Sequence, residues 1–262
     1  MISQYSNTFE ATYALETIHH IINSAQILHV SFNPPNSPFP VIIPMLGQMG
    51  SFARPSADLG DVLDLYLHGY VSSRVMNLSR DPSSPEENKG LPLCVAASHV
   101  DGLVLALTPN AHSYNYRSAV LFGHATVVED VDEKLYAMEL ITDGVVPQRW
   151  ANTRVPPNKA EMSSTSVLRV RISNGSAKIR SGPPSDDKGD KDDRDVVSSV
   201  WAGVVPVHTT LGEPIPGPYN EVGKVPEYLE EWRKDYNQAA HEEAITAANT
   251  VMQPKKSKDD DE

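Results

Sequence analysis

The chain has one cysteine, Cys94, and no apolar run approaching the roughly 18 residues that a membrane span needs. A single cysteine excludes an internal disulfide framework and a cysteine-rich metal site, and it fits a reducing compartment. The first residues, MISQYSNTFEATY, lack the charged-then-apolar order of a signal peptide. The sequence therefore predicts a cytoplasmic protein without a membrane partner.

The common catalytic motifs are also missing. There is no G-x-G-x-x-G, no G-x-x-x-x-G-K-[ST] and no G-x-S-x-G. His19 and His20 are adjacent on a predicted helix, so they point to different faces and cannot chelate one metal ion. A net charge of −12 argues against a general nucleic-acid-binding protein, because phosphate contact needs a basic surface.

What the chain does contain is enough apolar sequence for a sizeable core, with 40% hydrophobic residues in 262. Short alternating segments separated by turn signals, few helices and no βαβ rhythm predict a mainly β (α+β) fold: a closed or nearly closed antiparallel β-barrel of six or more strands with flanking helices. The pairs Asp101-Gly102 and Asn174-Gly175 are predicted hairpin turns. Helices are expected at 8–25, 72–79, 132–143 and 226–251, and strands at 27–32, 39–46, 63–69, 91–100, 102–108, 119–130, 165–172, 176–179 and 200–207, the last with Trp201 in the sheet.

The barrel domain is expected to span residues 1–210. Within it, 181–196 is rich in aspartate and poor in apolar residues, which predicts a mobile acidic loop. That loop lacks the ligand order of an EF-hand, so no metal site is expected there. A linker and helix at 211–251 and a disordered charged tail at 252–262 complete the predicted organisation.

The most informative stretch is LDLYLHGYVSSRVM, residues 63–76. Its alternating leucines predict a half-buried strand that ends at Gly69, and a helix should begin near Ser72, Ser73 and Arg74. Two hydroxyls, a guanidinium and free backbone N–H groups at one point would suit a phosphate. The structural alternative is an N-cap serine followed by a surface arginine.

A second polar cluster, Tyr114–Ser118, stands directly before the strand AVLFGHATVVED. Such positions often contact ligands. The alternative is a tyrosine-rich strand entrance in which Arg117 pairs with a carboxylate. The sequence leaves both interpretations open.

The order of short motifs resembles a known family. LHVSF, FPVIIPM, LYLHGYVSSRVM, LCVAASHVDGLVLA, SYNYRSAVLFGHATVVED and VWAGVVPV follow one another as in the pyridoxamine 5′-phosphate oxidase-like, FMN-binding split-barrel superfamily. The resemblance covers about residues 8–210 and is greatest to the flavin-nucleotide-binding branch related to nitroimidazole-resistance proteins. It implies a homodimer of six-stranded antiparallel split β-barrels with two FMN sites at the subunit interface.

The resemblance also implies a set of flavin contacts. The matching positions are His68, Ser72, Ser73 and Arg74 for the phosphate, Val41, Ile42, Ile43 and Pro44 for the ring, Asn115, Tyr116, Arg117 and Ser118 for the ring or the phosphate, and Trp201 near the ring. The arginine- and lysine-rich phosphate set and the C-terminal arginine-histidine motif of the vitamin-forming enzymes are absent. Pyridoxamine phosphate oxidation is therefore not the expected reaction.

The expected function is an FMN-dependent oxidoreductase that passes electrons from a reduced nicotinamide, NAD(P)H, to a small acceptor such as a nitroaromatic or a quinone. The flavin supplies the redox chemistry, so no catalytic side chain can be named. One alternative is a haem-binding or haem-degrading protein. Its axial ligand would be one of five histidines: His29, His68, His99, His112 and His124. Another alternative is a binding protein that holds FMN without turnover.

Overall fold

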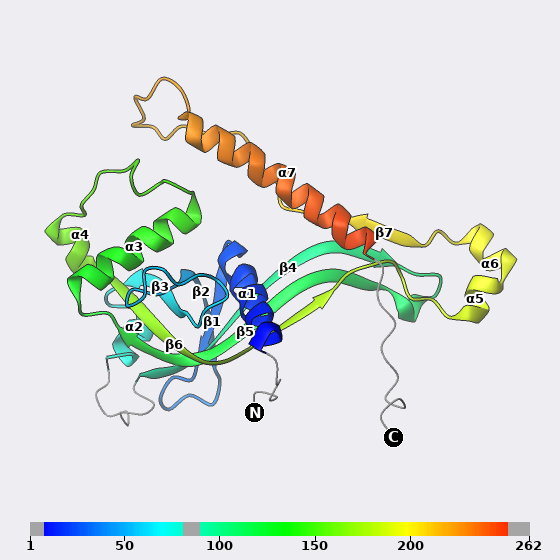
Figure 1. Cartoon of the computed structure of the whole chain (residues 1–262), viewed down its shortest axis with the longest axis horizontal. Helices are drawn as coiled ribbons and strands as arrows, with labels where there is room; N and C mark the ends of the chain where they lie inside the picture. Colours follow the sequence, from blue (N-terminus) through cyan, green and yellow to red (C-terminus); the bar gives the residue numbers. More distant parts are fainter. Residues whose placement is uncertain (1–7, 81–89, 251–262) are drawn as a thin grey trace. The chain divides into compact units, whose positions relative to one another are not determined.

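The computed structural model of the chain describes residues 8–80 and 90–250 (Figure 1). The side chains up to residue 13 and the predicted charged tail lie outside these described parts. So does most of the polar, turn-rich segment 81–90, for which the sequence predicts a solvated loop. The chain divides into two compact units. Unit 1 comprises 1–99 and 118–178, and unit 2 comprises 100–117 and 179–262. Neither border falls at residue 210, and a domain that spans 1–210 stays a prediction.

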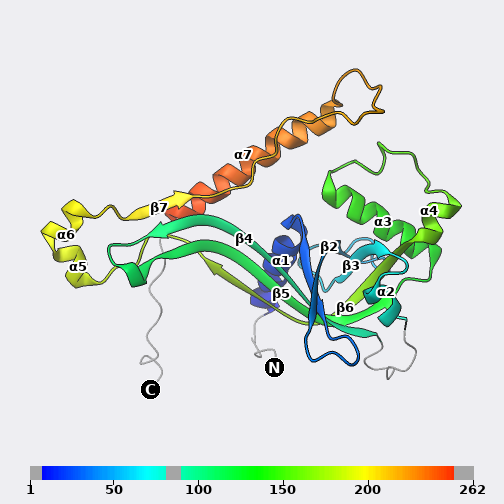
Figure 2. The same ribbon diagram turned by 180° about the vertical axis from the view of Figure 1, so that it is seen from behind.

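Six antiparallel strands form the barrel, which confirms the predicted fold class (Figure 2). The barrel closes because β1 pairs with both β2 and β4, so that His29 lies opposite Pro44 on one side and Ala96 on the other. A seventh strand, β7, pairs with the end of β4 in unit 2. In sheet order the strands are β1 (Leu28–Phe32), β2 (Val41–Gly50), β3 (Asp64–Tyr70), β6 (Thr165–Arg180), β5 (Ser113–Val127), β4 (Leu91–Leu105) and β7 (Gly203–Pro206).

The four predicted helices are present, and three short ones were not predicted. The helices of unit 1 are α1 (Thr8–Ser24), α2 (Arg74–Leu78), α3 (Val131–Val145) and α4 (Lys159–Ser164), and those of unit 2 are α5 (Lys188–Asp192), α6 (Arg194–Ser199) and α7 (Glu227–Asn249). The acidic segment 181–196 contains α5 and the start of α6. The Asp193 side chain caps α6 by accepting hydrogen bonds from the N–H groups of Asp195 and Val196. The mobility of this segment stays a prediction.

Both predicted hairpin turns are wrong. Asp101-Gly102 lies inside β4 and Asn174-Gly175 lies inside β6, so each pair of predicted strands is one long strand. Neither glycine has a positive φ. A Cβ at Gly102 would come within 2.8 Å of Val204, and one at Gly175 within 2.9 Å of Leu121. These glycines therefore allow neighbouring side chains to approach and do not turn the chain.

The alternation of β3 separates two apolar clusters in unit 1. Leu65 and Leu67 point into the barrel, where α1 adds Ile21 and Ile22 to the main core. Tyr66 points outward into a smaller cluster that α3 covers with Ala137 and Ile141. No helix in the described ranges has the length and apolar character of a membrane span.

The buried histidine His19 makes the stability of the fold depend on pH. His19 is 2% exposed, and its Nδ1 lies 2.8 Å from the carbonyl oxygen of Leu59. Burial lowers the pKa of His19 from its ordinary value of 6.5, although the hydrogen bond to Leu59 opposes the shift. The folded state therefore binds a proton at His19 less readily than the unfolded state does.

We expect the free energy of unfolding to be unaffected by His19 above about pH 6.5, and to fall as the pH drops through this value toward the lower folded-state pKa. Urea unfolding at several pH values will measure this. His19→Gln should reduce the loss of unfolding free energy at acid pH, whereas His20→Gln, a change at the exposed neighbouring position, should leave that loss as in the wild type. An equal dependence of the unfolding free energy on pH in all three proteins would contradict the assignment.

Candidate functional site

The turn from β3 into α2, Gly69–Arg74, is the strand–helix corner. Ser73 is the N-cap of α2, yet its side chain makes no capping hydrogen bond. Its Oγ is buried and has no hydrogen-bond partner in the described parts of the chain. Leaving a buried hydroxyl unpaired costs about 1–3 kcal/mol. An external acceptor at this corner would remove that cost.

Cations surround the corner without carboxylate partners. Arg74 is exposed and forms no ion pair with any described residue. Arg80 donates to neutral oxygens: the Val71 carbonyl at 3.1 Å, Asn77 Oδ1 at 2.8 Å and Ser166 Oγ at 3.0 Å. No local sequence pattern links Arg80 to Ser166, which lies 86 residues later, so the place of Arg80 at the corner could not be predicted.

Lys134 adds to this positive charge. Its Nζ donates to the carbonyl oxygens of Met162 and Thr165, both at 2.6 Å. Partial burial lowers the pKa of Lys134, and the nearby charge of Arg80 lowers it further. Sequence reasoning missed Lys134 as well, since it lies on α3 and looks like an ordinary surface lysine.

His68 lies on the opposite face of β3 from Ser73. A Cβ at Gly69 would point to the barrel side, 2.7 Å from Met76 Cε and 4.0 Å from Ser73 Oγ, so the preceding His68 side chain points outward. His68 is exposed and makes no hydrogen bond with a described residue, yet the surrounding protein withdraws it from water enough to lower its pKa. The imidazole is therefore neutral at neutral pH.

An outer strip of the barrel contains His68 and the predicted ring-binding strand. In β2, Ile42 is 64% exposed and Leu46 is 39% exposed, while Val41 and Ile43 pack against the core. Pro44 is also exposed and lies opposite His29, and Leu46 lies opposite His68. The outer strip, defined as His29, Ile42, Pro44, Leu46 and His68, is an apolar surface between two histidines.

Asn115, in unit 2, is fully buried and fully bonded. Its Nδ2 donates to the carbonyl oxygens of Gly182 at 3.1 Å and Ala247 at 3.3 Å, and its Oδ1 accepts from Arg180. These bonds fasten β5 to the segment after β6 and to the end of α7. A flavin contact of Asn115 stays a prediction, and its hydrogen bonds already serve the fold.

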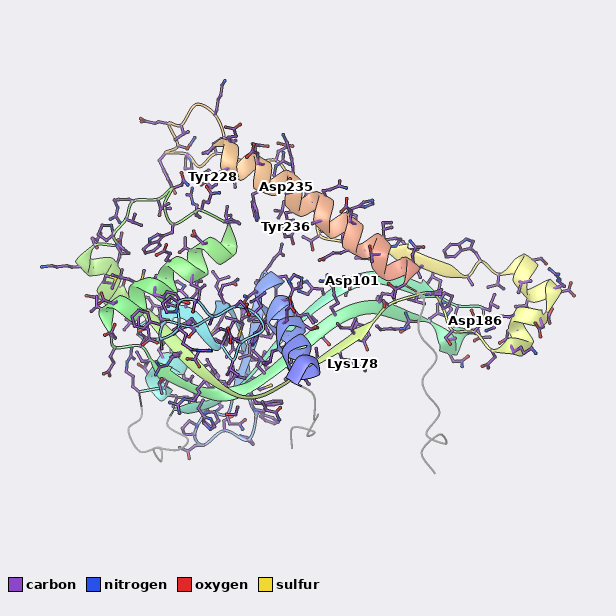
Figure 3. The ribbon with its side chains drawn as sticks, in the orientation of Figure 1. Asp101, Lys178, Asp186, Tyr228, Asp235 and Tyr236 are labelled. Atoms are coloured by element: carbon purple, nitrogen blue, oxygen red, sulfur yellow. The ribbon has the colours of Figure 1, made fainter. Side chains whose placement is uncertain are left out.

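Arg117 is similarly engaged. Its guanidinium donates two hydrogen bonds to Asp101, at 2.9 and 3.0 Å, and pairs with Glu243 of α7 at 3.0 Å. Asp101 lies on β4 where the C-terminal half of α7 passes (Figure 3). The alternative in which Arg117 pairs with a carboxylate is confirmed, and its flavin role stays a prediction.

The remaining predicted residues lie in different places. Ser118, in unit 1, donates from Oγ to the Lys178 carbonyl at 3.0 Å, and Tyr116 lies on β5 in unit 2. The prediction that Trp201 stands in the sheet is wrong. β7 begins at Gly203, and Trp201 lies before it with 65% of its surface exposed and its ring against Gly203. The apolar run at 200–207 predicts a longer strand than the one that pairs with β4, which starts at Gly203.

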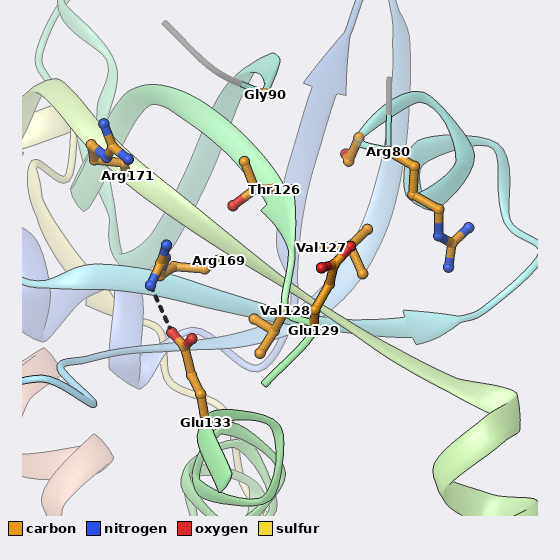
Figure 4. A pocket seen from close by; sticks show the side chains of 10 residues that line it. Arg80, Gly90, Thr126, Val127, Val128, Glu129, Glu133, Arg169 and Arg171 are labelled. Carbon is orange, nitrogen blue, oxygen red and sulfur yellow. Dashed lines mark hydrogen bonds and ion pairs between the residues drawn. The ribbon is translucent and has the colours of Figure 1, made fainter. Parts of the chain in front are cut away.

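Unit 1 also contains a cavity of about 500 Å³, here called the arginine pocket. In Figure 4, Arg169 and Arg171 project from β6 and Glu133 from α3, beside the end of β5. Arg169 pairs with Glu133 at 3.0 Å, and Glu133 also accepts a hydrogen bond from Tyr66 at 2.9 Å. Burial first, and Glu133 second, raise the pKa of Tyr66 far above its ordinary value. The described lining consists of Ser79, Arg80, Gly90, Thr126, Val127, Val128, Glu129, Glu133, Arg169 and Arg171.

Asn115→Leu should destabilise the protein even without a cofactor, because it removes the buried hydrogen bonds of Asn115 to Arg180 and to the Gly182 carbonyl and puts an apolar side chain among these polar groups. The expected loss is about 2–3 kcal/mol in the free energy of unfolding. Denaturant unfolding of the flavin-free protein measures it, with the exposed Asn220→Leu as control. An unchanged midpoint for Asn115→Leu would contradict a structural role.

Comparison with known proteins places the chain in a family. No curated protein matches it. The structure is similar to that of the flavocytochrome Anf3 from Azotobacter vinelandii, with 28% identity, a TM-score of 0.65, and coverage of 84% of this chain and 91% of that one. It is also similar to an FAD and heme binding protein from Mycobacterium smegmatis, with 27% identity, a TM-score of 0.66, and coverage of 83% and 94%.

The sequence itself matches the family described as pyridoxamine 5′-phosphate oxidase over residues 15–179. This match spans the whole barrel from α1 to β6, including the strand–helix corner. The predicted superfamily is thereby confirmed, whereas the nitroimidazole-resistance branch stays a prediction. The chain belongs to the pyridoxamine 5′-phosphate oxidase family.

Proposed function

We propose that the protein binds a flavin nucleotide, as FMN or FAD, and that it is an oxidoreductase. The observation that carries this proposal is the buried hydroxyl of Ser73, which has no hydrogen-bond partner among the described residues, next in sequence to the exposed Arg74, which has no ion pair among them. Ser73 would donate a hydrogen bond to a phosphate oxygen, and Arg74 would add a forked cation. The descriptions of the two relatives, a flavocytochrome and an FAD and heme binding protein, support a flavin.

A bound flavin supplies hydride and electron transfer, and the protein has to hold it and shield it from water. Ile42 and Pro44 expose apolar side chains on the outer strip, where a flavin ring or a second copy of the chain would cover them. We therefore keep the homodimer with shared flavin sites as part of the proposal. The donor is proposed to be NAD(P)H, and the acceptor a nitroaromatic or a quinone.

The visible spectrum of the purified protein tests the flavin. We expect a flavin double band, and a flavin dissociation constant raised about ten- to hundredfold in Ser73→Val and in Arg74→Gln, because each loses a hydrogen bond to a charged group. Arg194→Gln, which changes an exposed arginine of α6, is the matched control. Unchanged binding in both corner variants would refute the proposed phosphate site.

NADPH oxidation by the flavin-loaded protein then separates an enzyme from a binding protein. Turnover with a nitroaromatic or a quinone is the expected outcome. A flavin that stays oxidised in the presence of both nicotinamides would favour storage or sensing.

A second candidate is haem binding at His68. A haem iron needs an axial side chain and an apolar platform. His68 offers a neutral imidazole without a hydrogen bond to any described residue, beside Leu46 on the outer strip. By contrast, His99 contacts Ser24 Oγ at 3.2 Å, and His112 contacts the Thr108 carbonyl at 3.0 Å. The described residues hold no cluster of three or more metal-ligating side chains.

Addition of haemin should produce a Soret band that disappears in His68→Ala and persists in His112→Ala. The band reports ligation directly, because the axial imidazole determines its position. A Soret band that survives in His68→Ala would exclude this histidine as the ligand.

A further inference from the structure

The arginine pocket has binding chemistry that the strand–helix corner does not use. Its volume of about 500 Å³ lies within the range of small-molecule sites. Three guanidinium groups from two elements line it: Arg80 follows α2, and Arg169 and Arg171 lie two residues apart on β6 and so share one face of that strand.

The charges of these arginines are compensated unequally. Glu133 pairs with Arg169 at 3.0 Å, whereas Arg80, among the residues that the structure describes, contacts only neutral oxygens. Arg171 makes no hydrogen bond or contact ion pair within the described ranges. Its interaction with Asp64 is electrostatic, without direct contact. A guanidinium that lines a cavity without a partner favours a carboxylate or phosphate ligand.

The other walls favour a nucleotide over a simple anion. Thr126 offers a hydroxyl, and the exposed Glu129 carboxylate has no hydrogen bond or ion pair among the described residues. A free carboxylate of this kind accepts hydrogen bonds from ribose hydroxyls. Val127 and Val128 provide apolar contact for a base. Phosphate, ribose and base would each meet a suitable side chain.

Arg80 links this pocket to the strand–helix corner. The same guanidinium that lines the pocket holds the Val71 carbonyl and Asn77, which bracket Ser72, Ser73 and Arg74 in sequence. We propose that the arginine pocket binds the adenylate half of a flavin dinucleotide through Arg171 and Arg80, so that the protein selects FAD over FMN. This inference rests on the proposed flavin function and names the form of the flavin.

Titration of the flavin-free, full-length protein with FAD and with FMN tests the proposal. The wild type should bind FAD at least about tenfold more tightly than FMN, which is the effect of one or two hydrogen bonds to a charged group. Arg171→Gln should weaken FAD binding about tenfold and leave FMN binding within about twofold. AMP should compete with FAD and leave FMN bound.

Two controls keep the outcomes distinct. Arg194→Gln should bind FAD as tightly as the wild type. Arg171→Lys keeps the positive charge but loses the forked guanidinium, so its affinity for FAD should fall between those of the wild type and Arg171→Gln. Circular dichroism of each variant checks its fold. Ser73→Val should weaken both flavins equally, because it acts on the phosphate that they share.

Equal affinity for FAD and FMN, unchanged in Arg171→Gln, would overturn the pocket assignment and leave the flavin function standing. Failure of the wild type to bind either flavin would overturn both proposals. Selective loss of FAD in Arg171→Gln, with FMN retained, supports the assignment.

Discussion

The pairing of β1 with β4 is the constraint on which the barrel depends. β1 has only five residues, and its backbone bonds to β2 on one side and β4 on the other. Without the second pairing, two strands would have open edges and the core would have an open side. Closure sends Leu28, Val30 and Phe32 into the core and leaves His29 outside. Because the inside is filled with apolar side chains, ligand chemistry is confined to the barrel surface and its ends.

Local patterns were sufficient where the structure is local. The alternating leucines of β3 and the helices α1, α3 and α7 were predictable, because each depends on neighbours a few residues away. The end of β3 was predicted at Gly69, one residue before its actual end at Tyr70. The continuity of β4 and β6 was not predictable, because Gly102 meets Val204 across about a hundred residues. Arg80 and Arg171 were missed for the same reason: their surroundings are assembled from distant strands.

The strand–helix corner and the polar cluster at 114–118 were equally good ligand sites by sequence, and they differ in whether their polar groups find hydrogen-bond partners within the protein. The groups around Asn115 and Arg117 find all their partners inside unit 2, and they hold α7 and the end of β6 in place. In the other cluster, Ser73 Oγ has no hydrogen-bond partner and Arg74 has no ion pair among the described residues. Folding alone explains the cluster around Asn115 and Arg117. The buried hydroxyl of Ser73 carries a desolvation cost that a bound ligand would offset.

The borders between the units fall inside β4, β5 and β6, after residues 99, 117 and 178. Unit 2 therefore draws on two separate stretches of chain, and its first stretch belongs to strands that continue into the barrel. Neither one break in the chain nor one inserted segment would therefore separate unit 2 from unit 1 or carry it whole into another protein. The family match ends at residue 179, where the longer stretch of unit 2 begins. Since 100–117 lies inside the family match and almost all of 179–262 lies beyond it, unit 2 joins a stretch of the family's own strands to a stretch outside the family model.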